Sequence, residues 1–353
     1  GHCSILPVIK SNGYGLGAQE LASVAIDEGV PMLAVATVGE GISLRESFPD
    51  IPILTLLQPS TNELGPAIRS ELHLTLSDVK TAELVGDLAR KANRIVNVHC
   101  EIDAGMGRQG FQLESEPKGI LKITRISNVD IEGIYTHFPD ADQEDVTFTQ
   151  NQIQVFRQHL NDLSRSGIPY EMAHAANSAA ILNHANSYFD MVRPGIITYG
   201  VYPHNEVPVY SPLRPVATWK TRVVLVRDLP GGVGISYGRT YRTSSPEKIA
   251  TIPVGYADGF PRVLSNRGEV IIRGSRCPVR GAVTMNEIMV DVTHLSHVAT
   301  GDEVTLIGMD GSEEIRVEEL AEACGTIGYE ILTGIGSQVL RTYHKHTLAQ
   351  SDS

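Results

Sequence analysis

The sequence has few cysteines and no long apolar run, and each of these absences excludes a class of protein. The cysteines, Cys3, Cys100, Cys277 and Cys324, lie far apart and form no C-x-x-C pair, which removes the usual zinc and dithiol motifs. We predict that they are reduced and that the protein is cytoplasmic. No apolar stretch approaches the ~20 residues of a membrane span, and no signal-like segment precedes the predicted fold.

Basic residues are also scarce relative to acidic ones. The formal net charge is −12 at pH 7, so nucleic acids and anionic membranes would repel the chain at long range. Small molecules remain the expected partners, and no pattern predicts a metal site. The sequence begins inside a predicted strand, so it leaves open what precedes Gly1.

Short apolar runs alternate with helix-like stretches up to about residue 215. The runs are too continuous for half-exposed strands and are typical of buried parallel strands. We predict strands over residues 5–9, 32–36, 53–57, 72–76, 96–100, 131–135 and 191–192, with helices that include 19–29, 78–91 and 148–166. The dinucleotide-binding glycine motif is absent after the first strand, which favours a TIM-type (β/α)8 barrel over a doubly wound sheet.

The pattern changes near residue 214. From residue 216 onward, β-branched segments are broken by glycine and proline turns, and they predict a mainly β domain. Expected strands include residues 221–226, 248–254 and 303–307, and one helix is expected over 317–324. We therefore predict an α/β barrel domain over residues 1–214 and a mainly β domain over residues 215–353.

Lys10 is placed at the end of the first predicted strand, directly before a glycine-rich segment. In such a barrel, the carboxyl ends of the strands face the active site. An amine that is desolvated there loses its proton readily and can attack a carbonyl to form a Schiff base. The alternative is a solvated lysine at the start of a loop, and this segment alone does not decide between the two.

The segment around Lys10, PVIKSNGYGLG over residues 7–17, is similar to the cofactor-lysine motif of alanine racemases, which usually reads V-V-K-A-N-A-Y-G-H-G. Further motifs that resemble this family follow in the family's order: DAGMGR (103–108), THF (136–138), HAANS (174–178), VRPGI (192–196), ISYG (235–238), GYADG (255–259), TM (284–285) and GYE (328–330). The family has a (β/α)8 barrel followed by a β domain, in agreement with the pattern above.

The resemblance implies an isomerase that uses pyridoxal 5′-phosphate, bound covalently by Lys10, to interconvert L- and D-alanine for cell-wall peptidoglycan. Racemisation needs one proton-transferring group on each face of the substrate Cα. The resemblance assigns Lys10 to one face and Tyr237, from the partner subunit of a homodimer, to the other. It implies that His137 orients this tyrosine. Arg193 would meet the pyridine nitrogen and leave it unprotonated, because arginine only donates hydrogen bonds.

The remaining assignments that the resemblance implies concern binding. The cofactor phosphate is assigned to Tyr14, Ser178, Gly195, Ile196 and Tyr329, and Asn177 is assigned to cofactor binding. Asn177 and Ser178 can equally form a helix cap. Arg108 would contact the cofactor phenolate oxygen and, together with the backbone N–H of Met285, the substrate carboxylate.

The chain departs from the family pattern at three positions. Many members carry a carbamylated lysine where this chain has Glu101, and we hypothesise that this carboxylate supplies the same charge to hold Arg108. Leu16 and Asn286 replace the usual histidine and aspartate, which places substrate preference in question. Retention of Tyr329 favours alanine over serine, because a tyrosine there crowds the substrate side chain.

Three alternatives remain open. A serine or broad-specificity racemase would share the scaffold. A pyridoxal-phosphate decarboxylase is disfavoured by Arg193, because those enzymes place an acidic residue at the ring nitrogen. A non-catalytic cofactor carrier is disfavoured by the second domain with Tyr237, which such carriers lack.

Overall fold

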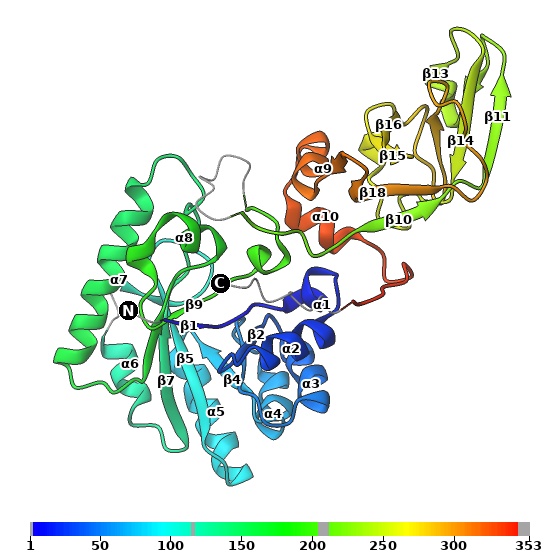
Figure 1. Ribbon diagram of the computed structural model, residues 1–353. Helices are drawn as coiled ribbons and strands as arrows, with labels where there is room; N and C mark the ends of the chain where they lie inside the picture. Colours follow the sequence, from blue (N-terminus) through cyan, green and yellow to red (C-terminus); the bar gives the residue numbers. More distant parts are fainter. Residues whose placement is uncertain (1–2, 114–116, 204–211, 345–353) are drawn as a thin grey trace, which may run out of the picture. The chain divides into compact units, whose positions relative to one another are not determined.

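The computed structural model describes residues 3–113, 117–203 and 212–344 (Figure 1). The chain divides into two compact units. The first comprises Gly1–Tyr14, Leu21–Val216 and Ile327–Tyr329, and the second comprises Gly15–Glu20, Ala217–Thr326 and Glu330–Ser353. The domain boundary predicted between residues 214 and 215 stays a prediction.

The first unit contains a ring of eight parallel strands. Their spatial order is β1-β9-β8-β7-β5-β4-β3-β2, and an isolated parallel bridge between Val8, in the segment that follows β1, and Ala34 of β2 closes the ring. The ring is thus a closed TIM-type barrel, as predicted. The strands are β1 (Ser4–Ile5), β2 (Leu33–Val35), β3 (Ile53–Thr55), β4 (His73–Leu76), β5 (Val96–Asp103), β7 (Val129–Tyr135), β8 (Met172–His174) and β9 (Met191–Val192), and β6 (Phe111–Gln112) pairs with β5 outside the ring.

Helices connect the strands and lie around the barrel (Figure 1). They are α1 (Lys10–Tyr14), α2 (Ala18–Asp27), α3 (Val38–Ser47), α4 (Thr61–Arg69), α5 (Val79–Ala92), α6 (Lys118–Ile123), α7 (Thr147–Arg165) and α8 (Ser178–Asn183). Their starts follow local chemistry. Thr37 and Glu40 form a capping box before α3, and the Asp78 side chain accepts from the Thr81 N–H at the start of α5.

The second unit is mainly β and its strand pairs are antiparallel. One sheet has the order β10-β18-β15-β16 with β19 beside β18, another has β11-β14-β17, and β12 pairs with β13. The strands are β10 (Trp219–Arg222), β11 (Leu225–Leu229), β12 (Gly234–Ile235), β13 (Tyr241–Arg242), β14 (Glu247–Ile252), β15 (Glu269–Ile272), β16 (Ser275–Pro278), β17 (Ile288–Asp291), β18 (Glu303–Asp310) and β19 (Glu313–Ile315). Helix α9 (Val317–Cys324) coincides with the predicted helix, and α10 (Gly328–Gly334) follows it.

The predicted elements differ from the structure in several places. The first predicted strand, residues 5–9, is shortened to β1 (Ser4–Ile5), and β6 (Phe111–Gln112) was not predicted. Strand β8 was not predicted, because it has only three residues and none of them is β-branched. The single strand expected over residues 221–226 is divided between β10 and β11, which belong to different sheets. Among the described residues, no helix combines the length and the apolar character that crossing a membrane would require.

Candidate active site

The carboxyl ends of the barrel strands carry most of the predicted site residues. Lys10 follows the run that begins with β1, Arg108 follows β5, and His137 follows β7. Ser178 comes shortly after β8, and Arg193 directly follows β9. Parallel strands in a closed barrel end on one face, so these side chains share the face on which barrel enzymes bind their substrates.

Lys10 begins a short turn of left-handed backbone. Ser11, Asn12 and Gly13 have φ angles of 54°, 53° and 61°. This conformation costs a residue with a side chain about 1–2 kcal/mol. Glu40 of α3 offsets part of this cost, because its carboxylate accepts the Ser11 N–H at 2.6 Å and the Ala36 N–H at 2.8 Å. The turn is therefore tied to the neighbouring strand–helix junction.

The amine of Lys10 is in an environment that disfavours its charge. Burial lowers the pKa of Lys10, and the positive charge of Arg108 lowers it further, whereas Glu40 acts in the opposite direction. A lower pKa increases the fraction of neutral amine, which is the form that attacks a carbonyl. The position and the electrostatics of Lys10 thus suit a nucleophile.

A small polar cradle lies around Gly195. Its N–H donates to Ser178 Oγ at 2.8 Å, and a Cβ added at Gly195 would lie 2.4 Å from Tyr14 Oη. The Tyr14 and Tyr329 rings are 5.9 Å apart. Burial raises the pKa of Tyr14, and that of Tyr329 to about 12, so both hydroxyls stay protonated and can donate. The buried residue Ile196 follows directly in the chain.

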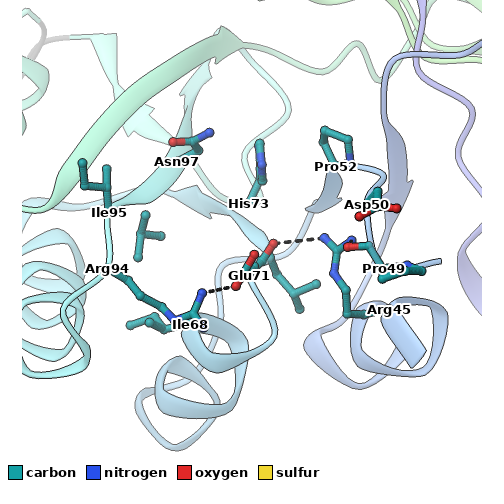
Figure 2. A pocket seen from close by; sticks show the side chains of 12 residues that line it. Arg45, Pro49, Asp50, Pro52, Ile68, Glu71, His73, Arg94, Ile95 and Asn97 are labelled. Carbon is teal, nitrogen blue, oxygen red and sulfur yellow. Dashed lines mark hydrogen bonds and ion pairs between the residues drawn. The ribbon is translucent and has the colours of Figure 1, made fainter. Parts of the chain in front are cut away.

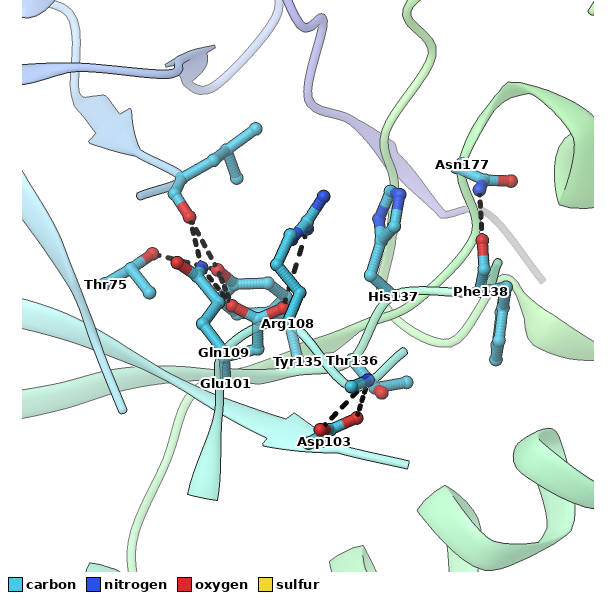
Figure 3. A network of polar contacts seen from close by, with 12 residues as sticks. Thr75, Glu101, Asp103, Arg108, Gln109, Tyr135, Thr136, His137, Phe138 and Asn177 are labelled. Carbon is cyan, nitrogen blue, oxygen red and sulfur yellow. Dashed lines mark hydrogen bonds and ion pairs between the residues drawn. The ribbon is translucent and has the colours of Figure 1, made fainter. Parts of the chain in front are cut away.

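Asn177 takes the structural role that the sequence left open. Its Oδ1 accepts from the Ala180 N–H at 3.0 Å, which caps α8, and its Nδ2 donates to the Phe138 carbonyl at 3.0 Å (Figure 3). These two hydrogen bonds fix the start of α8 and thereby the position of the adjacent Ser178 hydroxyl.

Arg193 is buried and held from several sides. Its Nη2 donates to the carbonyls of Thr136 at 2.7 Å and Ala175 at 2.9 Å, and it lies 3.2 Å from His137 Nδ1. Its Nη1 donates to His174 Nδ1 at 2.8 Å. Burial lowers the pKa of Arg193 to about 10, against the opposing charges of nearby acidic groups. Arg193 is thus a fixed, protonated donor at neutral pH.

His137 is neutral in this setting. Burial lowers its pKa well below the ordinary value, and the positive charge of Arg193 adds to that effect. Arg193 Nη2 cannot accept a hydrogen bond, and a proton on Nδ1 would face its N–H groups, so the single proton of the neutral ring belongs on Nε2. His137 therefore presents an N–H donor on its far edge.

Glu101 lies beside Arg108, as the hypothesis from the sequence requires, but its strongest bonds are elsewhere. Arg108 Nη2 is 4.0 Å from Glu101 Oε1. Glu101 Oε2 accepts from the Tyr135 hydroxyl at 2.9 Å and from the Gln109 amide (Figure 3). Burial raises the pKa of Glu101, and these bonds and the charge of Arg108 oppose the rise. The carboxylate is placed to act on Arg108 through space.

Two predicted residues, Tyr237 and Met285, belong to the second compact unit. Both are exposed, with 77% of Tyr237 and 56% of Met285 accessible. Tyr237 begins a short 3-10 turn that Ser236 enters with a φ of 57°. The other ten predicted residues all belong to the barrel unit.

A polar network inside the barrel was not predicted. His99, Glu132 and His174 lie on strands β5, β7 and β8 and are hydrogen-bonded in a row that leads to Arg193. The available signal was the presence of His99 and Glu132 within strands that the sequence predicts to be buried.

The protein has a barrel with a lysine and two arginines at the carboxyl ends of its strands, and a second unit of antiparallel strands. These features define it as an enzyme with a TIM-type barrel and a β domain. Residues 1–203 match the alanine racemase N-terminal domain and residues 216–343 match the alanine racemase C-terminal domain. The chain therefore belongs to the alanine racemase family.

Individual relatives are similar to this chain in sequence and structure over nearly its full length. The alanine racemase of Halothermothrix orenii is 43% identical over 339 residues, which covers 96% of this chain and 89% of the relative. The alanine racemase structure from Clostridium difficile 630 has a TM-score of 0.92 at 36% identity and covers 97% of this chain and 89% of that one. The Bartonella henselae alanine racemase, solved with covalently bound pyridoxal phosphate, has a TM-score of 0.86 at 30% identity and covers 97% and 93%.

Proposed function

We propose that this chain is a pyridoxal-phosphate-dependent isomerase that interconverts L- and D-alanine, with Lys10 and Tyr237 as its two proton-transferring residues. One observation carries the proposal. Lys10 lies at the carboxyl end of the barrel with a lowered pKa, and the chain around it belongs to the alanine racemase family over both of its parts. The curated relatives at about 40% identity are named alanine racemases.

The donor set of the barrel fits the cofactor. The space in front of Gly195 is bordered by the hydroxyls of Tyr14 and Ser178 and would be filled by any side chain at position 195, so it suits a phosphate group. Lys10 supplies the amine for the cofactor aldehyde, and Arg193 supplies a donor for the ring nitrogen. When bound, pyridoxal phosphate withdraws electrons from the substrate Cα and makes its hydrogen acidic.

Arg193 limits how strongly that withdrawal acts. Arginine donates hydrogen bonds and does not give up its proton at neutral pH, so a ring nitrogen that faces Arg193 accepts a bond and stays unprotonated. The bound group would then be a weaker electron sink. Side reactions such as transamination are thereby suppressed, as a racemase requires.

The two bases would act from opposite faces of the substrate. Lys10 holds or delivers a proton at Nζ on one face, and Tyr237 does so at Oη on the other. Phenols lose a proton only at about pH 10. The Nε2–H that we assign to His137 is a donor suited to orient the tyrosine oxygen and stabilise its anion.

Substrate binding is proposed to rest on Arg108 and on the backbone N–H of Met285, both directed at the carboxylate. The guanidinium fork matches a planar carboxylate. Glu101, 4.0 Å from Arg108, keeps a negative charge beside that guanidinium. This role takes the place of the carbamylated lysine of other family members.

We further propose that the active enzyme is a cytoplasmic homodimer that supplies D-alanine for peptidoglycan. The exposed side chains of Tyr237 and Met285 support an interface, because the proposed chemistry requires both at an active site. Each subunit would then contribute its second unit to the barrel of its partner. The cysteines Cys3, Cys100, Cys277 and Cys324 are free, which is compatible with a reducing compartment.

The proposal is tested by incubating the purified holoenzyme with L-alanine in D2O. We expect loss of the α-proton signal and appearance of D-alanine, with L-serine and L-lysine reacting much more slowly. A Lys10→Ala variant is expected to lose turnover and the visible absorbance of bound cofactor. Absence of exchange with all three amino acids would refute the racemase proposal, and retained absorbance in the variant would refute the assignment of Lys10.

A further inference from the structure

A row of hydrogen-bonded side chains crosses the interior of the barrel. Arg193 Nη1 is 2.8 Å from His174 Nδ1, His174 Nε2 is 2.9 Å from His99 Nδ1, and His99 Nε2 is 2.9 Å from Glu132 Oε2. His73 Nδ1 also contacts Glu132 Oε2. His99 and His174 are completely buried. The row connects residues on β4, β5, β7 and β8 with Arg193, which directly follows β9.

The donor and acceptor in each of these bonds can be assigned from chemistry. Arginine only donates, so His174 Nδ1 must accept and carries no proton. Burial lowers the pKa values of His99 and His174, so each ring is neutral and has one proton. His174 therefore carries it on Nε2 and donates to His99 Nδ1. His99 in turn carries its proton on Nε2 and donates to Glu132.

The three bonds between Arg193 and Glu132 thus have the same direction, away from Arg193 and toward Glu132. Both imidazoles present a lone pair to the guanidinium side and an N–H to the carboxylate side. The groups described above as hydrogen-bonded to Arg193 are carbonyls and imidazole nitrogens, which carry no negative charge, and Glu101 acts on Arg193 only through space. The row itself ends at the carboxylate of Glu132.

We propose that Glu132 is a positioning residue for Arg193, because its carboxylate fixes the tautomers of His99 and His174 and so keeps the guanidinium in its donating arrangement. The consequence for catalysis rests on the proposed role of Arg193 at the cofactor nitrogen. With Glu132 neutral, the row can invert. The His174 Nδ1–H would then face the Arg193 N–H, and the guanidinium would be displaced.

The same residues also meet the geometric requirement for a metal site, since the ligand atoms of His73, His99 and Glu132 lie within 4.8 Å of one another. A divalent ion would take the lone pair of His99 Nε2 and move its proton to Nδ1. His174 would then have to accept at Nε2 and place its proton against Arg193. The bond between Arg193 and His174 therefore favours the hydrogen-bonded row over an ion.

The far end of the row reaches the opposite side of the barrel from Lys10. His73 lines a cavity of about 290 Å³ beside the amino ends of β3, β4 and β5, together with Arg45, Glu71 and Arg94 (Figure 2). Glu71 pairs there with Arg94 but is not part of the row. It therefore offers a control, with a carboxylate in the cavity that His73 lines and no bond to His99.

The inference is tested on the holoenzyme labelled with ¹⁵N-histidine, with signals assigned through single His→Gln variants. Long-range ¹H–¹⁵N correlation spectra distinguish Nδ1–H from Nε2–H rings. In the wild-type protein we expect neutral Nε2–H rings for both His99 and His174. In Glu132→Gln, whose amide can donate as well as accept, we expect Nδ1–H signals to appear and kcat to fall about tenfold, with KM changed less than about twofold. Glu71→Gln should alter neither, and Glu132→Asp should restore both.

Three results would overturn the inference. They are an Nδ1–H ring at His174 in the wild type, a fall in kcat of Glu132→Gln without any change of tautomer, and one tightly bound zinc ion per purified chain. The wild-type spectrum needs no substrate and no turnover. It therefore tests the row even where the racemase proposal fails, and a racemase with the wrong tautomers would refute only this inference.

Discussion

At the scale of single residues, Gly195 shows how the barrel leaves room for a ligand. Its φ of −112° and ψ of −97° lie outside the α and β regions that residues with a side chain favour. The glycine is also required by space, since a Cβ would meet the Tyr14 hydroxyl at 2.4 Å. The same absence of a side chain lets its N–H and the neighbouring hydroxyls face one small volume.

We therefore expect Gly195→Ala to weaken the binding of pyridoxal phosphate. Overpacking of about 1–3 kcal/mol corresponds to a loss of about tenfold or more in affinity. Titration of the cofactor-free protein with pyridoxal phosphate, followed by absorbance, measures the effect. Gly39→Ala is the matched control, because the nearest atom to an added Cβ there is at 4.0 Å. Equal affinities for the two variants would contradict the cradle.

The two proton-transferring residues should be separable. In Tyr237→Phe, one face of the substrate keeps its base, Lys10, and the other loses it. We expect solvent exchange of the α-proton to continue with one alanine enantiomer in D2O and to fall at least a hundredfold with the other. Parallel NMR time courses with L- and D-alanine measure this difference. A similar fall for both enantiomers would argue against a two-base arrangement.

The sequence predicted residues whose neighbours along the chain form a motif, such as Lys10 and Arg193. It did not predict the row from Glu132 through His99 to His174, because these three side chains meet only when β5, β7 and β8 become neighbours in the barrel. Contacts between residues far apart in the sequence produce no local motif from which they could be predicted. The bond pattern of Glu40 with the turn after Lys10 was missed for the same reason.

At the scale of elements, a helix or strand could be predicted where its apolar periodicity and the residues at its ends were distinct. The apolar runs at β2 and β3 are completely buried, which is why they were recognisable as central parallel strands. Helix α9 was predicted to the residue. Strand β8 was not predicted because its three residues, Met172–His174, lack the β-branched side chains that are typical of strands. Its identity comes from its neighbours β7 and β9 instead.

The start of α5 gives a prediction for stability. Asp78 accepts the Thr81 N–H at 2.7 Å, so we expect Asp78→Ala to lower the free energy of unfolding by about 0.5–2 kcal/mol. Urea denaturation at pH 7 measures the difference. Asp87→Ala in the same helix removes only an exposed pair with Arg90 and should cost less than about 0.5 kcal/mol. Equal losses would contradict the cap.

The same cap should depend on pH. Partial burial raises the pKa of Asp78, but bonds from Thr81, Gln58 and the Lys80 backbone outweigh it and hold the pKa below the ordinary 3.8. A carboxyl whose pKa is lower in the folded state stabilises the fold above its unfolded pKa. The difference between wild type and Asp78→Ala should therefore be constant from pH 7 to about pH 5 and shrink below about pH 4. A difference that grows on acidification would contradict this assignment.

At the scale of the whole molecule, the proposed function joins residues of both compact units. Lys10, Arg108 and Arg193 belong to the barrel unit, whereas Tyr237 and Met285 belong to the second unit. The change in sequence pattern near residue 214 predicted two parts of different composition. Composition and periodicity do not predict whether a barrel receives Tyr237 from its own chain or from a partner. That choice depends on the contacts between subunits.

The most direct test of the account is complementation between two inactive variants. Lys10→Ala and Tyr237→Phe are co-expressed with different affinity tags, and the heterodimer is isolated through both tags. If each active site takes Lys10 from one subunit and Tyr237 from the other, one of its two sites is intact. We then expect racemisation at about half the wild-type rate per dimer. A heterodimer no more active than either variant alone would contradict it.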